Sequence, residues 1–320
     1  MKKVTAFLLT LVSASASAQT TLMLYTSQPN QDAQQTVAAF EKQNPEIRVN
    51  WIRDGTTKLM ARFQTEREAG VKSPDLLLIA DSVTMESLKG EGLLYPYISQ
   101  YKSDYDLALY DAKGYYYGTK MITTGIAYNT QASFKPDSWW DLTKPNLRNL
   151  TAMPSPLYSG AALIHLATLT ENNNIGWDYY QQLKDNQVQA QGGNGGVLNA
   201  LSSGTKAYGA LVDYLAIREK AKGAPIEFVF PKEGVSMVTE PVAILADSKE
   251  KQAAQKFVDF LLSNQGQELV KSQGYLPASN IVGTPAGFPP RSEIKMMAFN
   301  PESALQNANN NKDRFAKIFN

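Results

Sequence analysis

Asp75-Leu76-Leu77-Leu78-Ile79-Ala80 is a continuous apolar run and the third strand-like segment in the early part of the chain. Two other candidates precede it, Thr21 to Tyr25 and Ile47 to Ile52. Helical spacing of apolar residues fills both intervals, over Asp32 to Gln43 and over Lys58 to Ala69. An uninterrupted apolar strand is typical of a parallel strand that helices cover on both faces. The β-α-β-α-β order therefore predicts an α/β sheet.

A second run of α/β units follows. Its expected strands are Ile122 to Asn129, Asn149 to Met153, Tyr208 to Val212, Ile226 to Phe230 and Ser236 to Leu245. Its expected helices include Ser159 to Thr170, Trp177 to Leu183 and Tyr214 to Lys222, and helical spacing returns at Lys249 to Leu262 and Gln265 to Gln273. A chain of 320 residues is long enough for two lobes. We expect it to pass between them near Thr123 and near Pro241.

The first 18 residues have the three-part organisation of a secretory signal peptide. Lys2 and Lys3 are basic, Val4 to Val12 is apolar, and the segment ends in Ala16-Ser17-Ala18. We expect cleavage before Gln19 and export of the mature chain. The alternative is an amphipathic N-terminal helix of the mature fold. No apolar stretch is long enough to span a bilayer, so the mature protein is expected to be soluble.

Composition narrows the possible classes of protein. The sequence holds 31 basic and 30 acidic residues, and loss of Lys2 and Lys3 would leave 29 basic residues. This near-neutral balance offers no electrostatic surface for nucleic acid, and no basic amphipathic helix suggests membrane docking. The chain contains no Cys, which excludes disulfides, thiolate catalysis and a cysteine-linked lipid anchor.

Small polar residues stand where predicted strands end and helices begin. They are Ser27, Thr56, Thr57 and Ser82 in the first half of the chain, and Ser159, Gly160 and Asn194 in the second half. The carboxyl ends of strands in an open α/β sheet face the binding crevice, and helix N-termini offer free N–H groups to anions. These residues are therefore candidates for binding one anionic group, although Ser and Thr also cap many helices without binding anything.

Two carboxylates and a phenol extend this candidate site. Asp213 and Tyr214 follow the strand Tyr208 to Val212 and open a helix. Asp213 there either caps the helix or accepts hydrogen bonds from ligand hydroxyls or an amine. Glu240 lies in an apolar strand, where a carboxylate needs a partner or solvent. We expect both carboxylates to face the crevice between the lobes.

Catalytic chemistry finds little support in the sequence. The single His, His165, lies in an apolar helical run, so a buried and satisfied imidazole is expected, and one His cannot build a multi-His metal site. Two S-x-x-K matches, Ser99 to Lys102 and Ser203 to Lys206, leave a Ser-Lys hydrolase as an alternative, but no K-T-G accompanies them. No phosphate-binding P-loop or dinucleotide motif is present. We expect no enzymatic activity, no cofactor and no resident metal.

Seven short motifs, each of low specificity alone, occur along the mature chain in a characteristic order. They are Leu24-Tyr25-Thr26-Ser27, Ser73-Pro74-Asp75-Leu76-Leu77, Gly125-Ile126-Ala127-Tyr128-Asn129, Ser138-Trp139-Trp140-Asp141-Leu142, Met153-Pro154-Ser155-Pro156 with Ser159-Gly160-Ala161-Ala162, Glu240-Pro241-Val242-Ala243-Ile244, and Phe257 to Leu262 with Gly274-Tyr275-Leu276-Pro277. Together they resemble type 2 periplasmic solute-binding proteins of ABC importers. The resemblance is to the branch that includes ferric-iron, phosphonate and sugar-phosphate binders.

The resemblance implies an α/β fold of two lobes, joined by two crossing hinge strands, with the ligand cleft between them. Residues 19–122 plus 242–280 would form lobe 1, residues 123–241 plus 281–320 would form lobe 2, and residues 1–18 the signal peptide. It also implies a soluble periplasmic monomer that closes over its solute like a hinged clamp and delivers it to an inner-membrane ABC permease, without catalysis. A sensor subunit that presents its ligand to a receptor would use the same clamp and is an alternative.

The resemblance leaves three ligand classes: phosphorylated or phosphonate solutes, ferric iron, and other anionic or polyol-like solutes. Ferric-iron binders of this branch hold the metal with two adjacent tyrosines, whereas this chain has Val212-Asp213-Tyr214 at that place. Sugar-phosphate members carry a His beside that Asp, and Val212 replaces it here. A small phosphorylated or phosphonate solute suits the hydroxyl-rich helix starts, with Asp213 and Glu240 contacting its organic part. We expect this anionic class, with ferric iron, which also accepts Asp and Tyr oxygens, as the alternative.

Overall fold

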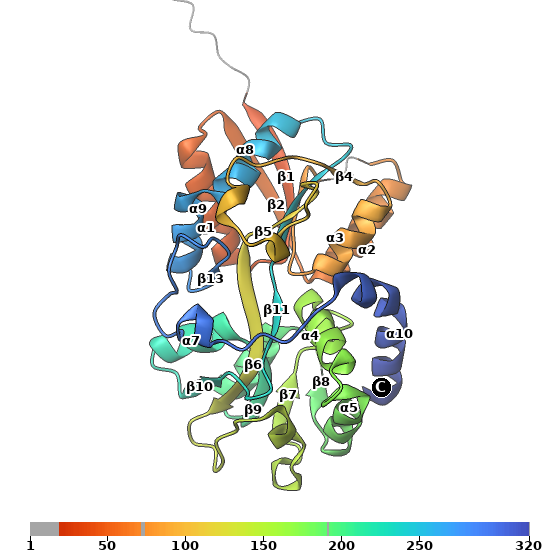
Figure 1. The fold of residues 1–320 in the computed structure, drawn as a ribbon, viewed down its shortest axis with the longest axis vertical. Coiled ribbons are helices and arrows are strands. Elements are labelled where there is room, and N and C mark those ends of the chain that lie inside the picture. The colour runs from red at the N-terminus through yellow and green to blue at the C-terminus, as the bar shows by residue number, and fades with distance from the viewer. Residues whose placement is uncertain (1–18, 72–73, 191, 320) are drawn as a thin grey trace, which may run out of the picture.

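The computed structural model describes residues 19–71, 74–190 and 192–319. The expected signal peptide, residues 1–18, lies outside the described residues. The chain forms two lobes stacked along the long axis of the molecule, with extended segments running between them (Figure 1). Each lobe contains its own β-sheet with helices packed against it. This arrangement agrees with the α/β pattern expected in each half of the chain.

The sheet of the first lobe has the strand order β2-β1-β3-β12-β4, and β5 also pairs with β12. Its strands are β1 Thr20–Thr26, β2 Ile47–Arg53, β3 Leu76–Leu78, β4 Leu94–Tyr95, β5 Tyr117–Gly118 and β12 Pro241–Leu245. β1 runs parallel to β2 and β3, whereas β12 is antiparallel to β3. The apolar run of β3 is fully buried because it lies between β1 and β12 with helices nearby.

Helices from both ends of the chain cover this first sheet. They are α1 Asn30–Gln43, α2 Thr56–Glu68, α3 Ser82–Gly90, α8 Lys251–Leu262 and α9 Asn264–Ser272, with short 3-10 helices at Lys102–Asp104 and Leu107–Leu109. Phe40 of α1 packs edge-to-face on Phe257 of α8, with ring centroids 4.9 Å apart. Both rings are completely buried, so this contact fixes α8 beside α1 in the core of the first lobe.

The sheet of the second lobe has the order β10-β6-β9-β7-β8, and β11 and β13 also pair with β6. Its strands are β6 Lys120–Asn129, β7 Thr151–Met153, β8 Gln189–Ala190, β9 Tyr208–Val212, β10 Ile226–Val229, β11 Ser236–Val238 and β13 Leu276–Pro277. Its helices are α4 Gly160–Glu171, α5 Gly176–Asp185, α6 Asn194–Ser202 and α7 Asp213–Ala221, with 3-10 helices at Trp139–Thr143, Pro145–Leu147 and Arg291–Glu293. β7 is parallel to β8 and β9, and β6 is antiparallel to β9, so this sheet is mixed.

The expected buried imidazole is confirmed in α4. His165 is 6% exposed, and its Nδ1 lies 2.9 Å from Oγ of Ser236. Its ring packs on Trp139 with centroids 4.8 Å apart. Burial lowers the pKa of His165 to about 3, so the imidazole is neutral and belongs to the core rather than to a reactive site.

The chain crosses between the lobes at two neighbouring junctions, from β5 to β6 and from β11 to β12. The segment Ser236 to Leu245, expected as one strand, is divided in two. Glu240 takes a left-handed φ of +39°, which interrupts the extended backbone between β11 and β12. Oγ1 of Thr119 donates a hydrogen bond of 2.9 Å to the carbonyl oxygen of Glu240. This bond ties the two crossing segments together at the hinge.

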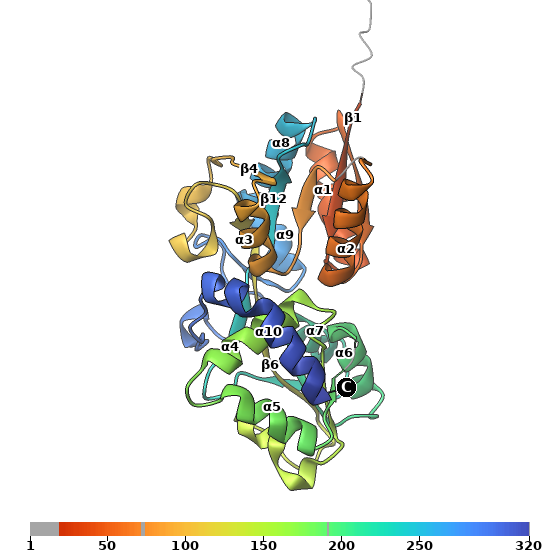
Figure 2. The ribbon, with the colours of Figure 1, turned by 90° about the vertical axis from the view of Figure 1, so that its right-hand side faces the viewer.

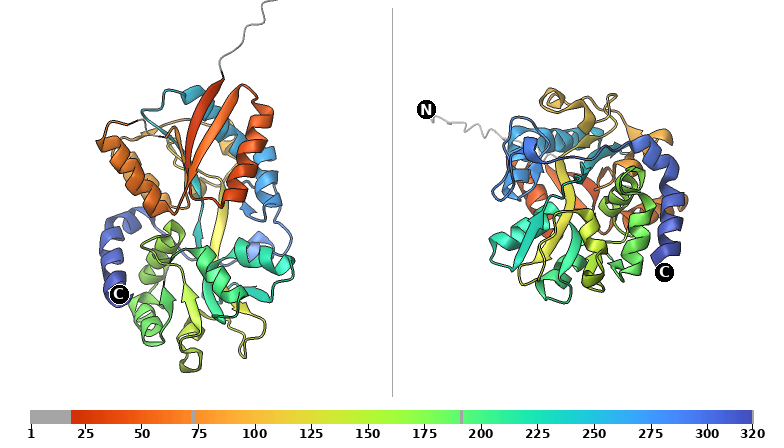
Figure 3. Two further views of the ribbon diagram at one scale, coloured as in Figure 1. Left: turned by 180° about the vertical axis from the view of Figure 1, so that it is seen from behind. Right: turned by 60° about the horizontal axis from the view of Figure 1, so that its bottom comes forward.

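Helix α10, Pro301–Phe319, lies along the second lobe against α4 and α5, and it also contacts α3 of the first lobe (Figure 2). It flanks the second lobe on the side opposite to α7 (Figure 3). Ala304 of α10 shares one apolar cluster with Val83 of α3 and Ile164 of α4. This cluster crosses from one lobe to the other, so the lobes are in contact outside the hinge as well.

Candidate functional site

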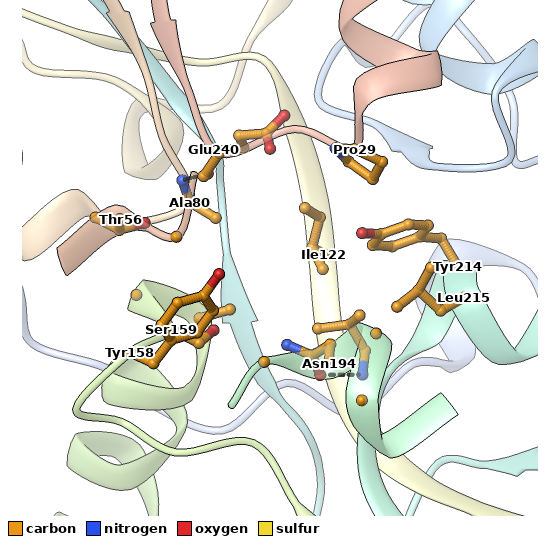
Figure 4. A pocket seen from close by; sticks show the side chains of 18 of the residues that line it. Pro29, Thr56, Ala80, Ile122, Tyr158, Ser159, Asn194, Tyr214, Leu215 and Glu240 are labelled. Atoms are coloured by element: carbon orange, nitrogen blue, oxygen red, sulfur yellow. Dashed lines mark hydrogen bonds between the residues drawn. The ribbon is translucent and has the colours of Figure 1, made fainter. Parts of the chain in front are cut away.

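A cavity of ≈ 340 Å³ lies between the lobes (Figure 4). The first lobe contributes Ser27, Pro29, Arg53, Gly55, Thr56 and Ala80, the second contributes Tyr158, Ser159, Gly160, Ala161, Gly193, Asn194, Gly195, Gly196, Val212, Tyr214 and Leu215, and the crossing segments contribute Ile122 and Glu240. This volume lies near the lower end of the range for small-ligand pockets. The cavity therefore suits a small solute that contacts both lobes at once.

Helix N-termini supply much of the cavity wall. The N-cap residues of α1, α2, α4, α6 and α7 all line it: Pro29, Gly55, Ser159, Gly193 and Val212. Pro29, Gly55, Gly193 and Val212 make no side-chain cap, and Asp213 accepts the N–H of Tyr214 in α7. First-turn N–H groups of α1, α2 and α6 are therefore left to be satisfied by water or a ligand. Each N-terminus also carries the positive end of a helix dipole. An anion in the cavity would be stabilised from several directions.

At one side of the cavity the two lobes touch through glycines, at what we call the glycine edge (Gly55, Tyr158 and Gly160). A Cβ on Gly55 would lie 2.6 Å from Cζ of Tyr158, and a Cβ on Gly160 would lie 2.7 Å from the carbonyl oxygen of Ala80. The hydroxyl of Tyr158 donates a 3.2 Å hydrogen bond to Oδ1 of Asp54. A side chain at Gly160 would meet the backbone of the other lobe and hold the lobes apart, and one at Gly55 would have to displace the Tyr158 ring, so this arrangement of the cleft is a closed one.

Behind Tyr214, which lines the cavity, an ion pair joins the lobes at what we call the ionic edge (Asp32, Arg218 and Tyr275). Oδ2 of Asp32, on α1, lies 3.1 Å from Nη2 of Arg218, on α7. The hydroxyl of Tyr275 donates a hydrogen bond to the same carboxylate. The Arg218 guanidinium also lies 4.5 Å from the Tyr275 ring and 4.6 Å from the Tyr214 ring, within cation–π distance. This edge therefore combines charge pairing with aromatic packing.

Seven of the ten residues expected at the site line the cavity: Ser27, Thr56, Ser159, Gly160, Asn194, Tyr214 and Glu240. Two of them also hold the backbone in place. Oγ of Ser27 accepts a 2.9 Å bond from the backbone N–H of Ala80, and Oδ1 of Asn194 accepts a 3.2 Å bond from that of Val212. The rule that placed these residues, that strand ends and helix starts meet at a crevice, accounts for their convergence.

Thr57, Ser82 and Asp213 differ from expectation, because none of them is among the cavity-lining residues. Thr57 points to solvent on α2, and Ser82 lies at the start of α3, where Asp81 is the cap. Asp213 is 1% exposed, and its Oδ2 accepts bonds of 2.9 and 2.7 Å from the N–H and hydroxyl of Thr123. Its carboxylate joins α7 to β6 rather than facing a ligand, and burial raises its pKa to about 7.

Glu240 lines the cavity, but its carboxylate is held within the hinge. The residue is 2% exposed, and its Oε2 lies 2.6 Å from Nζ of Lys120 and 3.2 Å from Nε2 of Gln28. The Lys120 ammonium also lies 4.1 Å from the centre of the Tyr275 ring. The charge of Glu240 is thus offset by a partner on the other crossing segment, and the residue stabilises the hinge.

Arg53 and Tyr158 line the cavity, although the sequence patterns did not identify them as candidate site residues. Nε of Arg53 donates a 2.9 Å bond to the carbonyl oxygen of Gln28, which ties this exposed side chain to the loop between β1 and α1 at the cavity. Among the lining residues that the structure describes, Arg53 is the one with a basic side chain. Arg53 ends β2, so the rule that strand ends face the crevice would have found it.

The contacts in the structure do not favour a metal site or a catalytic site. Burial raises the pKa values of Tyr214 and Tyr275, whereas a phenol must lose its proton to bind a metal. Within the described ranges, no group of three or more His, Cys, Asp or Glu side chains could hold a metal ion. Neither S-x-x-K match shows a Ser–Lys contact, since Ser99 donates to Asp259 and Lys206 to Asn149.

A family model for bacterial extracellular solute-binding proteins matches residues 71–301. The chain belongs to this family. The periplasmic binding protein AfuA of Actinobacillus pleuropneumoniae, solved with fructose-6-phosphate bound, superposes with a TM-score of 0.84 at 22% identity, over 94% of this chain and 99% of AfuA. Iron-bound HitA of Pseudomonas aeruginosa gives a TM-score of 0.79 at 22% identity, over 92% of this chain and 99% of HitA. A relative named spermidine/putrescine-binding periplasmic protein 1, from Haemophilus influenzae, is 26% identical over 246 residues, 70% of this chain and 65% of the relative.

These matches confirm the type 2 periplasmic binding protein fold, with two α/β lobes and the cavity between them. The protein is a periplasmic solute-binding component of an ABC transporter, and its family membership implies an inner-membrane permease as partner. Among the residues that the structure covers, none of the helices has the length and apolar character needed to cross a membrane. The names of the relatives point to three different solutes, so the cavity itself must indicate which class this protein binds.

Proposed function

We propose that this solute-binding protein captures a small phosphorylated or phosphonate solute by hinge closure and delivers it to its permease. The observation that carries the proposal is the convergence of five helix N-termini on one cavity, four of them without a side-chain cap from the N-cap residue. Thr56 and Ser159 add hydroxyl groups beside the N-termini of α2 and α4 (Figure 4). A tetrahedral dianion accepts several hydrogen bonds at once, which matches this set of donors.

The charges of the cavity wall also favour an anion. Arg53 adds a positive charge, and the negative charge of Glu240 is offset by Lys120. A polyamine would need unpaired carboxylates, and those of Asp213 and Glu240 are engaged inside the fold. Ferric iron would need deprotonated oxygen ligands, and burial favours the neutral phenol of Tyr214. Iron is the alternative that the experiment below separates from the proposal.

The proposal includes the mode of action. Lobe 1 comprises residues 19–122 plus 242–280, so it includes β13 together with Lys120 and Met121, the residues of β6 with which β13 pairs. Lobe 2 comprises residues 123–241 plus 281–320, and the lobes rotate about the two crossing segments. The protein acts as an exported monomer without catalysis, cofactor or resident metal. Small-angle scattering with and without solute would test both the monomeric state and the closure of one lobe on the other.

The first test is a thermal-shift screen of the mature protein. The panel holds glucose 6-phosphate, glycerol phosphate, aminoethylphosphonate, inorganic phosphate, spermidine and ferric citrate. A ligand that binds only the folded state raises the melting temperature by mass action, by an amount set by RT ln(1 + [L]/Kd). We expect shifts with phosphate- or phosphonate-bearing compounds that a chelator leaves unchanged. A shift confined to ferric citrate, with a visible tyrosinate absorption, or confined to spermidine, would overturn the proposal.

A matched pair of variants ties the binding to the cavity. Thr56→Val removes a hydroxyl from the cavity wall, whereas Thr57→Val makes the same change at the next, solvent-exposed residue of α2. Loss of one hydrogen bond to a charged group costs roughly 1.5–3 kcal/mol, so Thr56→Val should weaken phosphate binding by at least tenfold. Thr57→Val should leave the dissociation constant unchanged. Equal effects of the two variants would argue against binding at this wall.

A further inference from the structure

We infer that the organic part of the solute is a compact apolar group, aryl or short alkyl, rather than a polyhydroxylated sugar. This inference rests on the proposed function, because it takes the phosphate or phosphonate group to bind beside Thr56 and Ser159. It concerns the opposite half of the cavity, where Pro29, Tyr214 and Leu215 lie (Figure 4).

The carboxylates that could bind sugar hydroxyls are turned into the fold. Both oxygens of Asp213 accept hydrogen bonds, Oδ2 from Thr123 and Oδ1 from the N–H of Tyr214 at 2.6 Å. Oε2 of Glu240 is paired with Lys120 at 2.6 Å. A sugar entering this half would give up water from its hydroxyls without gaining these acceptors. Desolvated hydroxyls that find no partner weaken binding.

The side chains that do face this half are apolar and fixed in place. Ile122 is 4% exposed and Val212 is 2% exposed, so both are held by the core around them. The Tyr214 ring is supported from behind by Tyr275, with ring centroids 4.2 Å apart. Leu215 extends the same wall by one residue of α7. A rigid apolar wall of this kind favours an apolar solute group, because such a group gives up no hydrogen bonds to water when it binds.

Few polar side chains remain on this side, where the first-turn N–H groups of α1 also lie next to Pro29. The Oδ1 atom of Asn194 accepts the N–H of Val212, which leaves its amide N–H₂ as a donor toward the cavity (Figure 4). The hydroxyl of Tyr214 also points toward the cavity in the same view. These two side chains can bind one or two polar substituents on a ring. Backbone N–H groups only donate, so most hydroxyl hydrogens of a hexose would find no acceptor here.

Calorimetric titration of the mature protein with three phosphorylated probes tests the inference. Phenyl phosphate carries an apolar ring, glucose 6-phosphate carries a polyol of similar size, and inorganic phosphate has no organic part. We expect phenyl phosphate to bind at least tenfold more tightly than either of the others, because apolar pockets discriminate by ten- to two-hundred-fold per methylene-sized group. Ferric citrate is titrated alongside as the metal probe.

The outcomes separate this inference from the proposed function. If glucose 6-phosphate or inorganic phosphate binds as tightly as phenyl phosphate, the apolar-group inference is overturned and the anion-binding proposal stands. If all three phosphorylated probes fail to bind, both are overturned, whether or not ferric citrate binds.

A substitution in the apolar wall gives a readout that does not depend on overall stability. Leu215→Asn places an amide on the wall, and Leu157→Asn makes the same change at a residue that is 36% exposed and lies outside the lining. We expect Leu215→Asn to lower the ratio of phenyl phosphate affinity to inorganic phosphate affinity by about tenfold, and Leu157→Asn to leave it unchanged. An unchanged ratio in a folded Leu215→Asn variant would contradict the inference.

Discussion

The two edges of the cleft join the lobes by different physical means. At the glycine edge, the lobes approach because Gly55 and Gly160 have no side chain where Tyr158 and the backbone of Ala80 lie. At the ionic edge, Asp32 and Arg218 attract each other from opposite lobes. The lobes touch at the glycine edge only if no side chain lies there, whereas at the ionic edge they touch only if each charged residue keeps its partner of opposite charge. Substitutions at the first edge should therefore block closure, and substitutions at the second should remove attraction and leave a charge buried.

The largest effect is expected from Asp32→Asn at the ionic edge. The change leaves Arg218 without its counter-charge, and removal of one partner from a largely buried pair costs about 3–5 kcal/mol. Denaturant unfolding should show a loss near the lower end of that range, because the Arg218 side chain is 23% exposed. Asp106→Asn is the control, since its pair with Arg291 is on the surface and should contribute less than about 1 kcal/mol. Equal losses in both variants would show that the ionic edge is no stronger than a surface pair.

Gly160→Ala tests the glycine edge. Its Cβ would lie 2.7 Å from the Ala80 carbonyl oxygen and 2.9 Å from Oγ1 of Thr56, so the lobes could not close fully. Overpacking costs about 1–3 kcal/mol, which corresponds to roughly 5- to 150-fold weaker solute binding. The melting temperature without solute should hold or rise, because Ala favours a helix more than Gly does. Gly90→Ala, where an added Cβ meets nothing within 4 Å, should bind as the parent does. A Gly160→Ala variant with parental affinity would rule out steric closure at this edge.

The pH dependence of stability tests the contact that holds α7 in place beside the ionic edge. Asp213 joins β6 to α7, the helix that carries Arg218. Burial raises the pKa of Asp213 to about 7 in the folded protein, against about 4 when unfolded. The folded state then binds the proton more tightly, so this contribution is full below about pH 4 and is lost as the pH rises to about 7. The unfolding free energy should fall by up to about 1.4 kcal/mol per pH unit in this window.

Denaturant titrations between pH 4.5 and 8 on the parent and on Asp213→Asn check this dependence. The Asn variant lacks the titrating group, so the difference between the two unfolding free energies should change with pH in the direction given. Parallel curves for the two proteins would contradict a raised pKa at this position.

The smallest effect is expected from a double-mutant cycle between Gly55 and Tyr158. Gly55→Ala places a Cβ 2.6 Å from Cζ of the Tyr158 ring, and Tyr158→Ala removes that ring. If the clash alone impairs closure, the double variant should bind more tightly than the two single changes added together. The expected coupling is about 1 kcal/mol, or roughly fivefold in the dissociation constant. Additive effects would mean that the Tyr158 ring does not limit the approach of the lobes.

The local features of this structure could be predicted well from the sequence. Apolar periodicity found the order of strands and helices, and β9 occurs over the expected residues Tyr208–Val212. The strand-end rule brought Ser27, Thr56 and Ser159 together from opposite lobes. These features depend on residues near one another in the chain, or on the general rule that strand ends meet at a crevice.

Features that depend on distant partners could not be predicted in the same way. Nothing around Asp213 shows that Thr123 will donate to it, and nothing around Glu240 shows that Lys120 will neutralise it. Each pair joins residues far apart in sequence, and a carboxylate at a helix start has the same local pattern whether it faces a ligand or a strand. The ionic edge escaped notice for the same reason, since Asp32 and Arg218 belong to different lobes.

The central position of β12 in the first sheet has a consequence for the order of folding. Residues Pro241–Leu245 lie between β3 and β4, so the first sheet cannot be completed until chain from far downstream has arrived. The second sheet has its path β10-β6-β9-β7-β8 within one continuous stretch, from Lys120 to Val229. Shorter loops close at a lower entropic cost, and local contacts form faster than distant ones. The strands β6 to β10 should therefore pair first and act as the template on which α10 and the first lobe are assembled.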